Sequence, residues 1–178
     1  MSLGVSLSRD RVVLEPWHET YAEGLRAACA EDNAIWEIYP ICLSGEHFDA
    51  SLDNFLSRPN WIHFVVLDGD RVVGMTNFIN PDAKNGVVEI GGTYIAPSVR
   101  GSGFNRMMKT LMIEHAFAQG YRRIELRVDL RNTRSQRAVE KLGAVREGVL
   151  RKNMITWTGH LRDTVVFGLL KDEWVAVR

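Results

Sequence analysis

The order of elements expected along this chain is that of a mixed α/β sandwich built around one central sheet. In the first half, residues 61–67 and 71–78 read as strands joined by Asp68-Gly69-Asp70, which predicts an antiparallel hairpin. In the second half, a strand-like run over 87–95 is followed by a glycine-rich segment and by an amphipathic helix pattern over 106–118. A helix therefore crosses over before the next predicted strand, at 123–128.

The remaining elements follow in chain order, without internal repeats or low-complexity segments. A strand is expected at 11–14, a helix at 18–30, a short helical piece at 35–39, a longer helix at 46–56, a loop at 80–86, a helix starting near 132 and closing segments at 148–151 and 162–170. Paired glycines, Gly91 and Gly92, interrupt the strand over 87–95 and permit a bulge or a close backbone approach there. Close packing of a helix is the alternative reason for these glycines.

The glycine-rich segment between strand and helix has the composition of an anion site. Its residues are Arg100, Gly101, Ser102, Gly103, Phe104 and Asn105. Glycines allow successive amide N–H groups to point into one concavity, and the following helix adds the partial positive charge of its N-terminus. A pyrophosphate is the expected occupant.

Spacing separates three known phosphate motifs. A P-loop needs glycine where Met108 stands before Lys109 and Thr110. A dinucleotide fingerprint needs glycine where Arg106 stands. The pattern that remains, Arg/Gln-x-x-Gly-x-Gly/Ala, resembles the acyl-CoA loop of the GNAT acetyltransferase superfamily, with Asn105 in the last place.

A second segment strengthens this resemblance. Residues 132–144, Asn-Thr-Arg-Ser-Gln-Arg-Ala-Val-Glu-Lys-Leu-Gly-Ala, are similar to the superfamily's second signature, Asn-x-x-Ala/Ser followed by a helix ending in Glu-Lys-Leu-Gly-Phe. The closing segments are similar to those of the branch that acetylates the N-termini of ribosomal proteins, the RimJ/RimL-like branch. The resemblance covers residues 9–178, which are expected to form a single GNAT acetyltransferase domain.

The resemblance implies a mixed central sheet of about seven strands, flanked by helices, whose fourth and fifth strands splay apart. The pantetheine arm of acetyl-CoA is then expected to enter between those strands and to meet backbone groups of Tyr94 and Ile95. Residues 100–105 would hold the pyrophosphate, and Asn132 would bind a cofactor amide through its side chain. Many relatives carry a tyrosine general acid where this chain has Val139.

The implied chemistry is transfer of an acetyl group from a thioester to a primary amine. Glu89 is the candidate base, either directly or through a water, although pairing with an arginine of a neighbouring strand is the alternative. With Val139 unable to donate a proton, Ser135 is the candidate acid that stabilises the thiolate and also a cofactor contact; its alternative is a role at the start of the helix. The missing tyrosine keeps a second function open, a catalytically weak CoA-binding sensor or interaction module.

Composition sets the expected partners and location. The chain of 178 residues has zero formal net charge, yet residues 100–152 alone sum to +8, around the proposed phosphate loop. No apolar stretch is long enough for a membrane span, no signal peptide is evident, and Cys29 and Cys42 have no metal-ligand spacing, so a cytoplasmic protein with free thiols and no metal is expected. Acetyl-CoA and an amine acceptor are the expected partners, and a ribosomal-protein N-terminus is one candidate acceptor. A homodimer is one candidate assembly. Neither a membrane nor a nucleic acid is expected as a partner.

Overall fold

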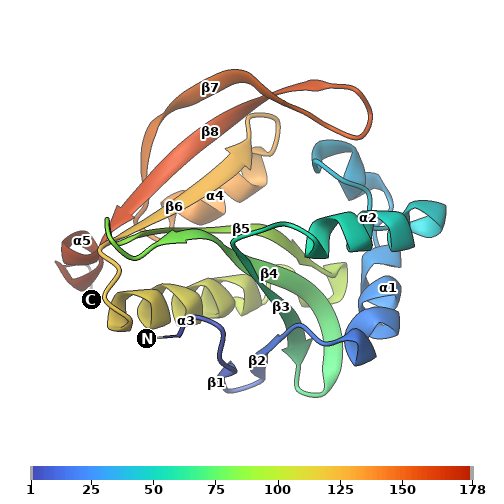
Figure 1. Cartoon of the computed structure of the whole chain (residues 1–178), viewed down its shortest axis with the longest axis horizontal. Coiled ribbons are helices and arrows are strands. Elements are labelled where there is room, and N and C mark those ends of the chain that lie inside the picture. The colour runs from blue at the N-terminus through green and yellow to red at the C-terminus, as the bar shows by residue number, and fades with distance from the viewer. Residues whose placement is uncertain (1, 177–178) are drawn as a thin grey trace.

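The fold is organised around one eight-stranded open sheet, seen in the computed structural model (Figure 1). The structure describes residues 2–176, of which 175 and 176 are described for the backbone only. The strands are β1 (Leu7–Arg9), β2 (Val12–Pro16), β3 (Trp61–Asp68), β4 (Arg71–Asp82), β5 (Val87–Ile95), β6 (Arg123–Asp129), β7 (Val145–Ile155) and β8 (Leu161–Leu170). The predicted mixed α/β fold is confirmed, with the short β1 preceding the strand expected near residues 11–14.

Strand order follows from the connections. The order across the sheet is β1-β2-β3-β4-β5-β6-β8-β7. The first five strands pair antiparallel, and so do β6 with β8 and β7 with β8. Only β5 and β6 are parallel, because a helix connects them and returns the chain to the same end of the sheet.

The helices match the expected order, with some ends in tighter 3₁₀ turns. The α-helices are α1 (Ala22–Ala30), α2 (Phe48–Leu56), α3 (Phe104–Ala118), α4 (Thr133–Glu140) and α5 (Lys171–Ala176). The 3₁₀ turns are η1 (Glu19–Tyr21), η2 (Ala34–Ile38), η3 (Gly45–His47) and η4 (Pro97–Val99). The helix expected over 18–30 therefore begins as a 3₁₀ turn, and the short piece near 35–39 is 3₁₀ throughout.

Two separate apolar clusters pack against the sheet. One joins α3 to strand residues such as Phe64, Phe78 and Ile90, and it also takes in Val139 of α4. The other joins α1 and α2 to Met75 and Tyr94. Because neighbouring strand residues face opposite sides, the same strands supply both clusters, which fixes the helices on their respective faces.

The strands β5 and β6 diverge after a short parallel ladder. Their pairing covers Val87 to Glu89 on β5 and Arg123 to Glu125 on β6. Beyond it, β5 continues to Ile95 while paired with β4, and β6 continues to Asp129 while paired with β8. We call this divergence, bordered by residues 91–95 and 126–129, the fork. It is the splay that the resemblance implied between the fourth and fifth strands, which become the fifth and sixth once β1 is counted.

Candidate functional site

A β-bulge lies on the β5 side of the fork. The register between β4 and β5 shifts between Met75 and Asn77, and Gly92 there has φ of +57°, a left-handed conformation that favours glycine. The amide Nδ2 of Asn77 donates to the carbonyl oxygens of Gly91 and Gly92, at 3.0 and 3.2 Å. The bulge that the paired glycines predicted is therefore present, and Asn77 holds it.

The bulge decides which backbone groups of β5 face the fork. The N–H of Ala96 donates to Val73 of β4, so the backbone groups of Tyr94, two residues earlier, also face β4. Those of Thr93 and Ile95 face the other way. The sequence analysis expected the backbone groups of Tyr94 and Ile95 to meet the pantetheine arm, whereas the geometry favours Thr93 in place of Tyr94. The difference arises because the alternation along a strand does not show which residue is the extra one of a bulge.

Side chains already engage two of these carbonyl groups. The hydroxyl of Tyr39 donates to the carbonyl oxygen of Thr93 at 2.7 Å, and Nε of Arg100 donates to that of Ile95 at 2.9 Å. The amide N–H groups of Thr93 and Ile95 are thus the donors on this edge that a ligand entering the fork would meet.

The loop over residues 100–105 has the backbone geometry expected of an anion site. Gly101 and Gly103 have φ of +75° and +82°, and helix α3 begins directly after Gly103. Within residues 2–176, no protein acceptor is recorded for the N–H groups of Gly101, Ser102 and Gly103, and the first three N–H groups of α3 lack partners inside the helix. The loop therefore presents a row of amide donors next to the positive end of a helix dipole.

The side chains of the loop contribute unequally. The Ser102 hydroxyl donates to the carbonyl oxygen of Val99 at 2.7 Å, and the Phe104 ring is buried in the core. Asn105 is half-buried, and its side-chain amide makes no recorded hydrogen bond within the described residues. Arg100 is committed elsewhere: besides Ile95, its Nη1 lies 2.5 Å from Oδ2 of Asp32. This ion pair holds the pKa of Asp32 below its usual value, chiefly through the hydrogen bond from Arg100.

Glu89 lies at the base of the fork, where it is the last residue of β5 that pairs with β6. Its side chain is 18% exposed, and its Oε2 is 3.4 Å from Nε of Arg127 on β6. Burial raises the pKa of Glu89, whereas the Arg127 charge opposes this rise. The ion pair with a neighbouring arginine, one of the two alternatives drawn from the sequence, is therefore present, and the same carboxylate borders the fork.

Lys109 of α3 is a charged residue of this region to which sequence reasoning gave no role. Its side chain is buried, and Nζ donates to Oγ1 of Thr93 at 2.6 Å. Thr93 Oγ1 lies in turn 2.8 Å from Oγ1 of Thr76. Burial lowers the pKa of Lys109 to about 7, and the charge of Glu89 opposes that fall. The sequence did not indicate that Lys109 is buried, because a lysine within an amphipathic helix pattern is normally expected to be exposed to solvent.

The start of α4 departs from what the sequence suggested for Asn132 and Ser135. Oδ1 of Asn132 accepts from the N–H of Ser135 at 3.0 Å, so Asn132 is the helix cap and Ser135 lies inside the first turn. Only Nδ2 of Asn132 is then left for a cofactor amide. The Ser135 hydroxyl is half-buried without a recorded hydrogen bond in the described chain, while Val139 is buried in the core.

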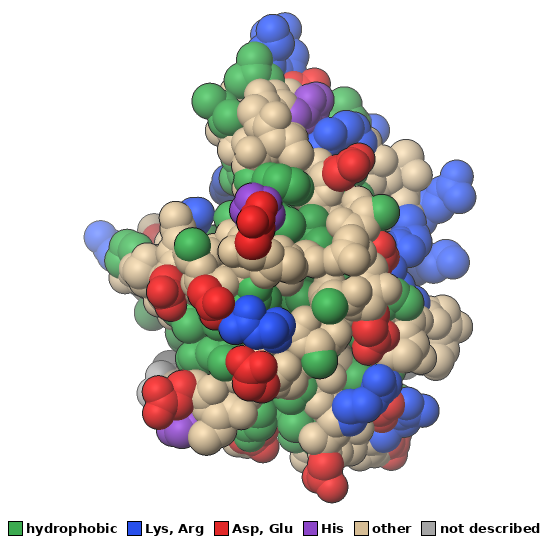
Figure 2. Space-filling model, turned by 90° about the vertical axis from the view of Figure 1, so that its right-hand side faces the viewer, with side chains coloured by type: hydrophobic (Ala, Val, Ile, Leu, Met, Phe, Trp, Pro, Cys, Tyr) green, Lys and Arg blue, Asp and Glu red, His purple; other side chains and the backbone are tan. Residues whose placement is uncertain are grey.

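The face that carries α1 and α2 bears several acidic residues, among them Glu23, Asp49 and Asp53. Figure 2 shows acidic side chains spread over this face, with basic ones among them. Arg26 bonds to both Glu23 and Asp49, and Asp32 is bound to Arg100. Ion pairing thus offsets part of the acidic character. Of the two aromatic residues that follow α1 here, Trp36 is buried and stacked on Tyr94, whereas Tyr39 reaches the fork through its hydrogen bond to Thr93.

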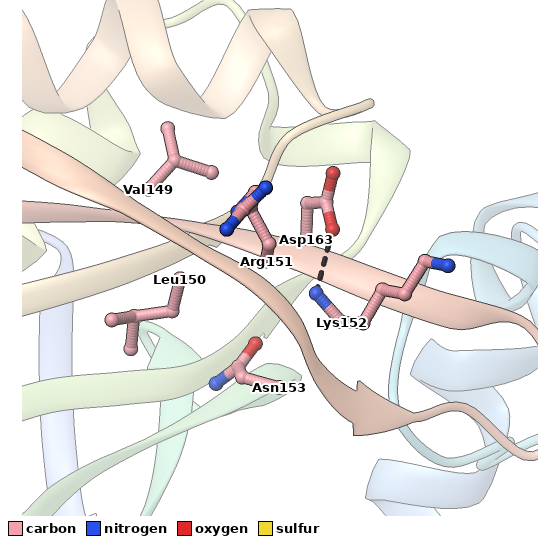
Figure 3. A pocket seen from close by; sticks show the side chains of 6 residues that line it. All are labelled: Val149, Leu150, Arg151, Lys152, Asn153 and Asp163. Atoms are coloured by element: carbon pink, nitrogen blue, oxygen red, sulfur yellow. Dashed lines mark hydrogen bonds between the residues drawn. The ribbon is translucent and has the colours of Figure 1, made fainter.

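The hairpin of β7 and β8 closes over the chain after α1. The N–H of Trp157 donates to the carbonyl oxygen of Pro40 at 3.0 Å, and its Nε1 to that of Trp36 at 2.7 Å. A hollow of about 670 Å³ lies on this hairpin, where the N–H of Lys152 donates to Asp163 at a three-residue bulge (Figure 3). None of the predicted site residues lines it, so the site rests on the fork and its loop.

Comparisons with known proteins agree with this geometry. A family model described as an acetyltransferase (GNAT) domain matches residues 11–145. An uncharacterized N-acetyltransferase of the SPbeta prophage of Bacillus subtilis is 30% identical, over 72% of this chain and 76% of its own. A putative acetyltransferase structure from T. thermophilus is 35% identical with a TM-score of 0.87, covering 97% of this chain and 92% of its own. The chain belongs to the GNAT acetyltransferase family, whose members transfer acetyl groups from acetyl-CoA.

A more distant structure shares the fold alone. Spermidine N-acetyltransferase from Vibrio cholerae, solved with CoA and spermine, is 20% identical with a TM-score of 0.75, over 94% of this chain and 99% of its own. Among residues 2–176, no group of side chains is arranged to hold a metal ion. The same part of the chain contains no helix both long and apolar enough to cross a membrane.

Proposed function

We propose that this GNAT acetyltransferase binds acetyl-CoA along the β5 edge of the fork and transfers the acetyl group directly to a primary amine, with Glu89 as the base. One observation supports the proposal most directly: a largely buried carboxylate lies at the closed end of a fork whose open edge presents amide donors. The amide donors of residues 101–106 would hold the pyrophosphate, and those of Thr93 and Ile95 would hold the pantetheine arm.

The chemical step is a single displacement. The amine nitrogen attacks the thioester carbonyl carbon, a C–N bond forms, the C–S bond breaks, and the electron pair leaves with sulfur as CoA thiolate. The amine proton goes to the Glu89 carboxylate, directly or through one water. A raised pKa suits this role, because a base works best when its pKa approaches the working pH. The charge of the Arg127 partner favours the ionised carboxylate and so opposes the effect of burial.

Three finer assignments remain parts of the same proposal. Ser135 would donate a hydrogen bond to the leaving thiolate; this assignment is supported by the fact that its hydroxyl makes no recorded hydrogen bond to any described residue. The acceptor would be a protein N-terminus of the ribosomal type or a small amine, supported by the closing segments. A homodimer has its support in β7, an exposed edge strand that carries Val149, Leu150 and Ile155 on its surface.

The test uses release of CoA thiol from acetyl-CoA with a panel of amines. Glu89→Gln is expected to lower turnover by about 10²-fold, because glutamine cannot take the amine proton, with little change in acetyl-CoA affinity, because Glu89 is not among the proposed acetyl-CoA contacts. Raising the pH should partly rescue the variant by supplying neutral amine. Glu114→Gln is the control, because Glu114 is also a partly buried carboxylate paired with an arginine, Arg9 of β1, at the edge of the sheet far from the fork.

A Glu89→Gln protein as fast as the parent at neutral pH would return Glu89 to ion pairing alone. A parent protein that binds acetyl-CoA but transfers acetyl to no amine would instead favour the alternative, a CoA-binding sensor or interaction module.

A further inference from the structure

The most unusual charge in this structure is the ammonium of Lys109, which lies inside the protein with few partners. The residue is 7% exposed, and Thr93 Oγ1 is the one acceptor that its Nζ reaches within the described chain. An ammonium group carries three N–H donors, so two are left without a recorded protein acceptor. A buried cation in this condition costs stability, which calls for a reason other than packing.

The position of Lys109 supplies that reason. It reaches the fork from the α3 side, because Thr93, its partner, belongs to the segment of β5 that has left β6. Its charge also interacts with that of Glu89, at the closed end of the fork. Lys109 is therefore linked to both parts of the proposed site: its ammonium group contacts the segment of β5 proposed to hold the pantetheine arm, and its charge interacts with the carboxylate proposed to take the amine proton.

We propose that Lys109 is a catalytic residue whose ammonium group donates to the thioester as it gains negative charge during transfer. This inference rests on the proposed function. When the amine attacks, negative charge develops on the carbonyl oxygen and then on the departing sulfur, and a fixed cation in a dry site stabilises it more than it stabilises the neutral thioester. Lys109 gives up no proton in the step, so the balance of the reaction is unchanged.

The surroundings set how this cation responds to pH. The charged group that acts on it is Glu89 on β5, and Arg127 and Glu125 on β6 and Arg162 on β8 act on Glu89 in turn. Thr93 supplies a neutral hydroxyl. The pKa of Lys109, lowered to about 7 by burial, means that the stabilising charge is complete in acid and is lost in base. The contribution of Lys109 to the rate must therefore shrink as pH rises.

The experiment compares the parent with Lys109→Met, which keeps the length of the side chain and removes its charge. Single-turnover acetyl transfer at about pH 6 should fall about 10²-fold, the size typical of a lost transition-state donor, with acetyl-CoA affinity within about threefold by calorimetry. The ratio of parent to variant rates should approach one above about pH 9, and taking this ratio cancels titration of the acceptor amine. Because the Lys109 charge also lowers the pKa of Glu89, the same comparison is made in a Glu89→Gln background, where the loss at about pH 6 should persist. Lys84→Met, at an exposed position between β4 and β5, removes the same charge as a control.

A role in structure alone gives another pattern, in which Lys109→Met changes thermal stability while the rate ratio stays near one at every pH. That result overturns the inference and leaves the proposed function standing. A loss of rate that is independent of pH overturns it as well. A parent protein that does not bind acetyl-CoA overturns the proposed function, and this inference falls with it.

Discussion

Replacing Gly92 with alanine should damage both the stability and the activity of the protein. Gly92 has φ of +57°, where an alanine is disfavoured by about 1–2 kcal/mol. The added Cβ would lie 2.6 Å from Nδ2 of Asn77, closer than real Cβ contacts come, so the amide must move. That movement breaks the hydrogen bonds to Gly91 and Gly92, each worth about 1 kcal/mol. We expect Gly92→Ala to lower the free energy of unfolding by about 3 kcal/mol.

Urea unfolding followed by circular dichroism measures this change. With a slope of about 2 kcal/mol per molar urea, the midpoint should fall by about 1.5 M. Gly148→Ala is the matched control, since Gly148 lies in β7 and a Cβ there meets nothing within 4 Å. The control should be neutral or slightly stabilising.

Activity should fall with stability, because the bulge sets the direction of Thr93. Without the bulge, the N–H of Thr93 and its hydroxyl, which accepts the hydrogen bond from Lys109, would no longer hold their present positions. A Gly92→Ala protein with the midpoint and turnover of the parent would refute this account of the bulge.

Two further predictions concern the loop and the support of the bulge. Gly103→Val should weaken CoA binding about tenfold or more by calorimetry, because the valine side chain would lie among the amide donors of the loop. Gly159 has the same φ of +82° and equally open surroundings, so Gly159→Val is the control and should leave CoA binding unchanged. Equal losses of CoA affinity in the two variants would point to backbone strain alone. His63 bonds to Asn77, and burial lowers its pKa below 6.5, so folding favours the neutral ring and stability should be lost as pH falls below about 6.5. In His63→Gln this part of the pH dependence should disappear from the unfolding free energy, and a variant with the parental pH dependence would exclude His63 as its source.

Much of the fold was predictable because the signals that define it are local. The hairpin of β3 and β4, helix α2 and the strand–loop–helix over β5 and α3 each depend on alternation, helical periodicity or glycine within a short window. The bulge too was predicted from Gly91 and Gly92. These features need no knowledge of which residues meet across the sheet.

The partners of the site residues were not predictable in the same way. Arg100 and Asp32 are far apart in the sequence, and nothing local announces that they pair. Tyr94 was named where Thr93 faces the fork, because one bulge residue reverses the alternation. The sequence did not point to a role for Lys109 in the site, because a lysine in a helix is normally exposed and the burial of Lys109 depends on where α3 packs.

The buried Val139 and the buried Lys109 bear on the same chemical problem. The resemblance implied a tyrosine general acid at the Val139 position, but here that side chain belongs to the same apolar core as α3, so a tyrosine introduced there would have to displace packed residues. A thiolate needs no proton if a cation stabilises its charge, since an adjacent positive group lowers the pKa of a thiol. With Lys109 in that role, the hydroxyl of Ser135 adds a hydrogen bond to a leaving group that is already stable as an anion. Ser135→Ala should then cost less than Lys109→Met in single-turnover transfer, and a larger loss for Ser135→Ala would make the hydroxyl the principal partner of the sulfur.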